Sequence, residues 1–170
     1  ALEKIIVSER LNQGFNDVDE FVKFSLSVQN RRKSRMGHAF ENHLEEIFVQ
    51  QQLRYERNAR TENKNKPDFL FPGADAYHDE LFDSSLLRML GVKSSCKERW
   101  RQVLNEAERI QEKHLCTLEP GISDNQTNQM NVAGLRLVVP LPLFETYTSE
   151  QQNWLLSVTD FVEHIKSLQQ

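Results

Sequence analysis

The segment at residues 86–110, LLRMLGVKSSCKERWRQVLNEAERI, constrains the possible folds more than any other stretch of this chain. It opens with an apolar run of strand length, and the residues that follow repeat apolar side chains at helical spacing. A strand that is apolar on both flanks is typical of a sheet covered on its two faces. We therefore predict a buried strand at 86–95 that leads into an amphipathic helix from about Cys96 to Lys113.

Apolar side chains at helical or alternating spacing divide the remaining chain into further helices and strands. We expect helices at 15–33, from Ser34 to about Gln52 and across 154–165, and strands at 53–57, 67–71, 114–119 and 134–140. The polar stretches at 72–84 and 120–130 are expected to be loops. This order predicts an α/β fold in which a central mixed β-sheet is flanked by helices.

The length and composition fit one folded domain over residues 1–170. The chain has 170 residues, of which 38% are hydrophobic and 27% charged, as in ordinary globular proteins. No apolar stretch is long enough to span a membrane, and Cys96 and Cys116 lack the spacing of a zinc site or a disulfide framework. We therefore expect a reducing, cytoplasmic setting. Because the first residue is Ala1 rather than Met, a processed product and a domain of a longer chain both remain open.

The formal net charge of -4 and the isoelectric point of about 5.8 do not favour binding to nucleic acid through overall charge. Basic residues nevertheless gather at 31–35, at 54–66 and in the set Lys97, Arg99 and Arg101. A single run of charges is more often a solvated face than a binding surface. Three such runs beside a possible metal site weaken that interpretation.

Three residues suited to acid–base or metal chemistry fall near the ends of the predicted elements. Asp68 stands at the start of one strand, Lys93 at the end of another, and Glu106 near the apolar edge of the following helix. Two neighbouring carboxylates repel unless a cation lies between them, and hard oxygen ligands suit Mg²⁺ with several waters retained. A nearby lysine can orient the attacking water or stabilise negative charge on a phosphate. On spacing alone, such a trio in a chain with 25 acidic residues is a weak signal.

The motifs around these residues resemble a known family. PD at 67–68, VK at 92–93, CK-x-RW at 96–100 and the late Glu106 together are similar to the catalytic domains of EcoRII-like type II restriction endonucleases. This branch of the PD-(D/E)xK nuclease superfamily also holds SsoII, Ecl18kI and PspGI. The likeness extends upstream to residue 31 and more faintly downstream to residue 140, so it covers most of the chain.

The resemblance implies a restriction-endonuclease-like fold and Mg²⁺-dependent hydrolysis of double-stranded DNA in a bacterium or archaeon. It implies that Asp68 and Glu106 bind the metal and that Lys93 completes the catalytic set with them. The tyrosine and the second lysine implicated around the site of such enzymes fall on Tyr77 and Lys97.

One position departs from the pattern of the superfamily. The acid that usually stands two residues before the catalytic lysine is absent, because Gly91 occupies that place. The resemblance implies that Glu106, thirteen residues after Lys93, supplies this carboxylate from the helix.

Residues directly after the catalytic lysine contact C·G pairs of CCGG half-sites in such enzymes, and this role falls here on Lys97, Glu98, Arg99 and Arg101. Lysine and arginine match guanine O6 and N7, and glutamate accepts from cytosine N4. Ion pairs along a helix would explain the same composition without DNA. The resemblance further implies a homodimer that cuts double-stranded DNA at a CCGG-type site with a central insert, such as CCNGG or CCWGG.

Two other functions remain open. A repair or resolvase-type nuclease of the same fold would use the 97–101 face to hold phosphates, and a DNA-binding module would keep the fold without the metal. Glu41 is a weaker candidate for a place near the metal, since exposed helix acids are common. Cys96, Trp100 and Trp154 are expected to be core residues.

Overall fold

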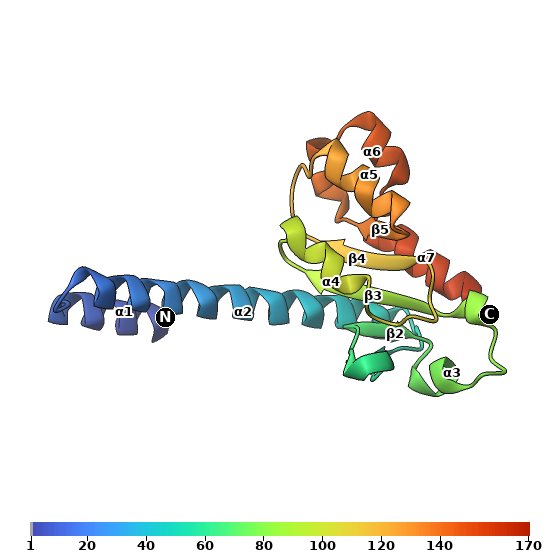
Figure 1. Ribbon diagram of the computed structural model, residues 1–170, viewed down its shortest axis with the longest axis horizontal. Helices are drawn as coiled ribbons and strands as arrows, with labels where there is room; N and C mark the ends of the chain where they lie inside the picture. Colours follow the sequence, from blue (N-terminus) through green and yellow to red (C-terminus); the bar gives the residue numbers. More distant parts are fainter. Residues whose placement is uncertain (1) are drawn as a thin grey trace. The chain divides into compact units, whose positions relative to one another are not determined.

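The computed structural model describes residues 2–170, apart from the side chain of Glu98 (Figure 1). The chain forms two compact units, Ala1–His38 and Ala39–Gln170. Helix α1 (Leu2–Gln13) and the first part of α2 (Val18–Gln50) make up the first unit. None of the helices within residues 2–170 combines the length and apolar character that a bilayer crossing requires. A single catalytic domain over 1–170 stays a prediction.

A five-stranded mixed sheet forms the centre of the second unit, in the order β1-β2-β3-β4-β5. Neighbours among β1, β2 and β3 pair antiparallel, whereas β3, β4 and β5 pair parallel. The mixed sheet predicted from the sequence is thereby confirmed. Its strands are β1 (Glu56–Arg57), β2 (Phe69–Phe71), β3 (Arg88–Lys93), β4 (Lys113–Thr117) and β5 (Leu135–Val138).

Short helices and 3-10 turns connect the strands. The α-helices after α2 are α3 (Ala74–His78), α4 (Trp100–Val103), α5 (Asp124–Val132), α6 (Ser149–Trp154) and α7 (Val158–Leu168). The 3-10 turns are η1 (Glu62–Lys64), η2 (Ser84–Leu86), η3 (Lys97–Arg99) and η4 (Leu141–Thr146).

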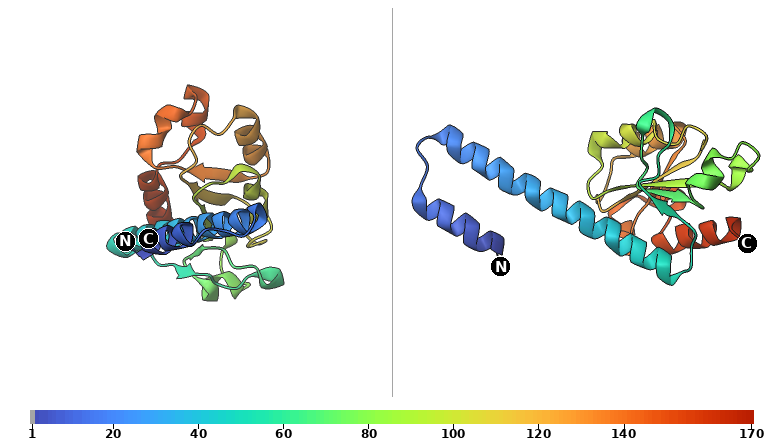
Figure 2. Two further views of the ribbon diagram at one scale, coloured as in Figure 1. Left: turned by 90° about the vertical axis from the view of Figure 1, so that its left-hand side faces the viewer. Right: turned by 90° about the horizontal axis from the view of Figure 1, so that it is seen from below.

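Alternating side chains of the strands build one core on each face of the sheet. On β2, Phe69 and Phe71 pack against Phe48 of α2, and Phe71 also packs against Phe161 of α7, with ring centroids 5.1 to 5.6 Å apart. Leu70, between them, belongs to the other core, to which α4 and α5 contribute. Figure 2 shows the end of α2 and helix α7 side by side against the sheet. Helices therefore cover both faces, as the sequence predicts.

The N-terminal helices differ from the expected ones. The sequence predicts a break at Ser34, but α2 continues without one from Val18 to Gln50. Gly37 does not interrupt it, and apart from the helix's own nearby backbone no atom of the described residues lies within 4 Å of where its Cβ would be. Helix α1 escapes sequence detection because none of its residues is buried, so it has no core-facing stripe.

Three expectations outside this region also need correction. The loop at 72–84 contains α3, and the loop at 120–130 contains α5, whose N-cap Ser123 accepts a hydrogen bond from the Gln126 amide. The predicted helix across 154–165 is interrupted, because the Leu156 amide donates to the Leu137 carbonyl at the edge of β5. The last helical segment is therefore α6 followed by α7.

The helix predicted from Cys96 to Lys113 is wrong in length. A 3-10 turn without a side-chain cap precedes α4, which ends at Val103. The backbone beyond α4 is bound by the segment before β2 instead of by a helical ladder. Asn65 donates to the Asn105 carbonyl at 2.8 Å, Thr61 accepts from Ala107 at 3.4 Å, and Glu62 accepts from Glu108 at 3.2 Å. Tertiary contacts thus override the helical periodicity of these residues.

Candidate functional site

Asp68 and Lys93 lie side by side where β2 begins and its antiparallel neighbour β3 ends. Asp68 directly precedes β2, and Lys93 is the last residue of β3. The Val92 amide donates to Asp68 Oδ2 at 2.6 Å, which fixes the carboxylate beside the end of β3. Lys93 Nζ lies 3.6 Å from the same oxygen, and the two side chains are only 23% and 16% exposed, respectively. The predicted pairing of these residues is therefore present in the structure.

Glu106 completes this group from the loop after α4. Its Oε2 is buried and has no hydrogen-bond partner among the described residues. Burial and the neighbouring Asp68 carboxylate raise the pKa of Glu106 to about 7, while Lys93 and Lys113 act in the opposite direction. The structure thus places the Asp68 carboxylate and the ammonium groups of Lys93 and Lys113 within electrostatic reach of the Glu106 carboxylate.

These residues fit a divalent cation of the Mg²⁺ type. A buried carboxylate oxygen without a donor, close to a second carboxylate, is the environment that a hard cation would relieve. No cluster of three or more His, Cys, Asp or Glu side chains within the described part of the chain is arranged to hold a metal. Two protein carboxylates with waters in the remaining positions are what Mg²⁺ commonly accepts.

Gly91 explains why the second carboxylate does not come from β3. A Cβ at this position would lie 3.1 and 3.2 Å from the two methyl groups of Val103. Val103 is fully buried where α4 packs on the sheet, so it cannot move aside cheaply. A longer acidic side chain at position 91 is therefore excluded by packing, and the carboxylate arrives from Glu106 beyond the helix.

Tyr77 forms its hydrogen bonds with residues outside the group of Asp68, Lys93 and Glu106. Its hydroxyl donates to the Glu62 carboxylate, with both oxygens at 2.6 Å, and accepts from the Arg109 amide at 3.2 Å. Burial and Glu62 raise the pKa of this phenol far above its ordinary value. No hydrogen bond among the described residues joins Tyr77 to Asp68, Lys93 or Glu106. Its place in catalysis stays a prediction.

The turn after β3 carries the residues expected to read DNA. Lys97 and Arg99 are exposed, and Lys97 has a positive φ of 28°. Arg101 is also exposed but engaged, because its guanidinium lies 4.4 Å from the Trp100 ring centroid and donates to Gln129 at 2.7 Å. The side chain of Glu98 lies outside the part that the structure describes. Lys97 and Arg99 are thus accessible to a polyanion, whereas Arg101 must leave Gln129 to reach one.

The predicted core residues of this region are placed as expected. Cys96 is fully buried and Trp100 is 2% exposed, while Trp154 packs against the same core from a partly buried position. Glu41 forms an ion pair with Arg57 at 2.9 Å on the flank of α2.

Sequence reasoning missed the residues that hold the Glu106 loop. Lys113 is 6% exposed, and its Nζ donates to the Ala107 carbonyl at 2.9 Å and to the Ile110 carbonyl at 2.6 Å. From the sequence, Lys113 is expected to be a polar residue at the end of a helix. Every residue of β4 is buried, so alternation would have shown only that Lys113 shares a sheet face with Leu115.

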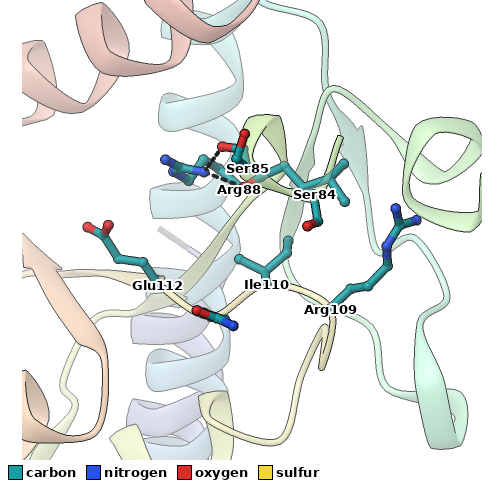
Figure 3. Close-up of a pocket in the computed structure, with 8 residues that line it drawn as sticks. Ser84, Ser85, Arg88, Arg109, Ile110 and Glu112 are labelled. Carbon is teal, nitrogen blue, oxygen red and sulfur yellow. Dashed lines mark hydrogen bonds between the residues drawn. The ribbon is translucent and has the colours of Figure 1, made fainter. Parts of the chain in front are cut away.

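A separate pocket of about 280 Å³ lies at the other end of β3, where Arg88 begins the strand that Lys93 ends. Figure 3 shows Arg88 and Arg109 on opposite sides of this pocket. Arg88 donates to the Ser85 and Leu87 carbonyls, and Arg109 to the Asp79 and Phe82 carbonyls. Both guanidinium groups thus donate hydrogen bonds to backbone carbonyls of nearby loops.

The fold is that of the restriction endonucleases. Two structures of Ecl18kI, described as metal-depleted complexes with uncleaved DNA, one of them modified, match with TM-scores of 0.76 and 0.78 at 21% and 19% identity. Each match covers 98% of this chain and 63% of the other. The predicted α/β, restriction-endonuclease-like fold is therefore confirmed.

The family described as EcoRII C terminal matches residues 1–162, and the chain belongs to this family. Over 168 residues the chain is 45% identical to the type II restriction enzyme EcoRII of Escherichia coli. This alignment covers 98% of the chain and 42% of that enzyme, so the chain spans less than half the length of this relative.

Proposed function

We propose that this chain is the catalytic part of a type II restriction endonuclease of the PD-(D/E)xK superfamily, which hydrolyses phosphodiester bonds of double-stranded DNA with Mg²⁺. The convergence of Asp68, Lys93 and Glu106 carries this proposal, together with a buried carboxylate oxygen that has no hydrogen-bond partner among residues 2–170 as described. Membership of the EcoRII C-terminal family supports it.

Asp68 and Glu106 are the residues that would hold Mg²⁺. The bound ion would lower the pKa of a coordinated water and neutralise charge on the scissile phosphate. Lys93, held beside Asp68, would stabilise the extra negative charge that develops on the phosphate or orient the attacking water. Lys97 and Tyr77 would act at the border of the site, Lys97 on a DNA phosphate and Tyr77 by holding Glu62.

The exposed residues after β3 would supply sequence recognition. Lys97 and Arg99 offer donors that match guanine O6 and N7, and Glu98 and Arg101 belong to the same turn. We propose a CCGG-type target with a central insert, such as CCNGG or CCWGG. Because such targets are close to palindromic, the enzyme would act as a homodimer in which each subunit cuts one strand.

The N-terminal helical unit supports the proposal of a homodimer. Helix α1 has no buried residue, although its sequence is not purely polar. Exposed apolar side chains of this unit, between 43% and 75% exposed, are Leu2, Ile5, Ile6, Leu11, Val18, Phe21, Val22, Leu26 and Met36. Apolar surface of this kind is typical of protein–protein interfaces. We propose that it is covered by the same unit of a second copy, in the cytoplasm of the host cell.

Digestion of a plasmid of known sequence, with and without Mg²⁺, followed by sequencing of the fragment ends, tests the proposed function. Discrete ends at CC/GG-flanked sites are the expected result. Random nicking would instead indicate a repair or resolvase-type nuclease, and intact plasmid with bound protein would indicate a DNA-binding module without catalysis. A steep salt dependence without sequence preference would mean that the turn contacts phosphates only.

A further inference from the structure

The loop that carries Glu106 has a backbone conformation that its sequence does not favour. Helix α4 ends at Val103, and Ala107, directly after Glu106, has a φ of +51°. For a residue with a Cβ, this left-handed conformation costs about 1 kcal/mol or more. The direction of the Glu106 carboxylate therefore depends on contacts that hold the loop from outside.

These contacts come from two sides. The segment before β2 binds the outer side, since Thr61 accepts from the Ala107 amide and Glu62 from the Glu108 amide. From within the sheet, Lys113 at the start of β4 reaches the Ala107 carbonyl at 2.9 Å and the Ile110 carbonyl at 2.6 Å. The main chain of Lys113 is itself fixed, because its amide donates to the Gly134 carbonyl at 2.8 Å. The ammonium group of Lys113 thus ties the loop to the start of β4.

Holding a turn with a buried ammonium group has a high free-energy cost, because the charge is removed from water. Lys113 is 6% exposed, and burial lowers its pKa, although Glu62, Glu106 and Glu108 favour its charged form. An uncharged donor would hold the carbonyls without the full cost of a buried charge. One of the two carbonyls that the ammonium group binds belongs to Ala107, the residue directly after Glu106, so this contact fixes the turn beside the Glu106 carboxylate.

We propose that Lys113 is a positioning residue for Glu106, which fixes the turn at Ala107 and thereby sets the affinity of the site for a divalent cation. This inference rests on the proposed function. Because Lys113 is buried, it would touch neither DNA nor the reacting phosphate, and its effect would pass through Glu106 alone.

Lys113→Met, which removes the charge and both hydrogen bonds but keeps an unbranched stem, tests the inference. Val162→Ala, which shortens a side chain in the core on the opposite sheet face, is the control for lost stability. Mn²⁺, which suits the same oxygen ligands as Mg²⁺, is titrated into each DNA-free protein and followed by electron paramagnetic resonance. The Mg²⁺ concentration that gives half-maximal cleavage is measured beside it.

We expect Lys113→Met to weaken Mn²⁺ binding and to raise the required Mg²⁺ concentration by about 10-fold or more, while DNA binding without metal stays unchanged. Val162→Ala should bind Mn²⁺ as the wild type does. Lys113→Leu, which removes the same charge and donors with a different apolar shape, takes the place of Lys113→Met if the latter does not fold. Failure of both variants to fold would contradict the inference, because Lys113 would then serve stability alone.

The two proposals fail in different ways. If the wild type binds Mn²⁺ and cuts DNA while folded Lys113→Met shows the same cation affinity, the positioning role is wrong and the proposed function stands. If the wild type neither binds the cation nor cuts DNA, the proposed function is wrong, and the positioning role falls with it.

Discussion

Glu106 is buried beside Asp68, and no donor in the described part of the chain reaches its Oε2, so ionisation of this carboxyl group is costly in the metal-free protein. Lys93 and Lys113 offset only part of this cost. A residue in such an environment is poised to exchange a proton for a cation near neutral pH.

The stability of the metal-free protein should therefore depend on pH through Glu106. The pKa of Glu106 is raised from 4.5 to about 7, so its contribution to stability is fully present below pH 4.5 and is lost as pH rises through 7. Urea unfolding of the metal-free protein should therefore show a loss of stability over this window relative to Glu106→Gln. Mg²⁺ should restore stability to the wild type above pH 7 but not to the variant. Parallel pH profiles of the two proteins would contradict this account.

Lys93 should contribute to the rate of the cleavage step. Lys93→Ala should lower the cleavage rate by at least about 100-fold, because one preorganised positive charge at the phosphate is lost. DNA binding and folding should change little. Lys166→Ala is the matched control, since Lys166 lies on α7 and binds Gln51 and Glu163. Single-turnover cleavage of a labelled duplex separates the two variants, and equal rates would remove Lys93 from the reaction.

Helix α4 shows at the element scale how packing decides where a catalytic group can come from. Gly91 lets Val103 approach β3, and the chain then leaves the helical path and brings Glu106 to Asp68. Strand periodicity was enough to place Asp68 and Lys93 at neighbouring strand ends, because buried strands follow a local pattern. The end of α4 was not predictable in this way. It depends on Thr61, which is distant in sequence.

Substitution of Gly91 tests this packing. Gly91→Ala should lower the free energy of unfolding by about 1 to 3 kcal/mol, because the new methyl group overpacks the core against Val103. Gly37→Ala is the matched control, since its Cβ position meets no described atom within 4 Å beyond the helix's own nearby backbone, and it should stabilise α2 by about 0.5 to 1 kcal/mol. Urea denaturation measures both. Adding Val103→Ala to Gly91→Ala relieves the overcrowding; if Gly91→Ala alone matches the wild type, the steric account is wrong.

The whole molecule joins a sheet-centred unit that holds the candidate site to a helical unit with much exposed apolar surface. The first of these could be predicted in outline from alternating apolar residues. Of the second, the sequence predicts the helix at 15–33, which lies largely within α2, but not α1, because α1 has no buried face. The helices of such a unit are stabilised chiefly by packing of their apolar side chains against another surface.

Self-association through the helical unit is a testable consequence. Phe21→Ser combined with Leu26→Ser should convert the proposed dimer to a monomer and reduce double-strand cleavage, because in that dimer each subunit would cut one strand. Leu81→Ser, at a side chain that is 96% exposed in a loop, is the control. Sedimentation velocity gives the oligomeric state. A wild type that is monomeric both alone and on DNA would contradict the proposed interface.

The most direct test of the cation-dependent site compares the wild type with Glu106→Gln on one duplex that contains a CC/GG-flanked site, with Mg²⁺ and with a chelator. The wild type should cut both strands at fixed positions only when Mg²⁺ is present. Glu106→Gln should bind the duplex and leave it intact. Cleavage by the wild type in the chelator, or cleavage by Glu106→Gln at the wild-type rate, would contradict the assignment of Asp68, Lys93 and Glu106 as a metal-dependent hydrolytic centre.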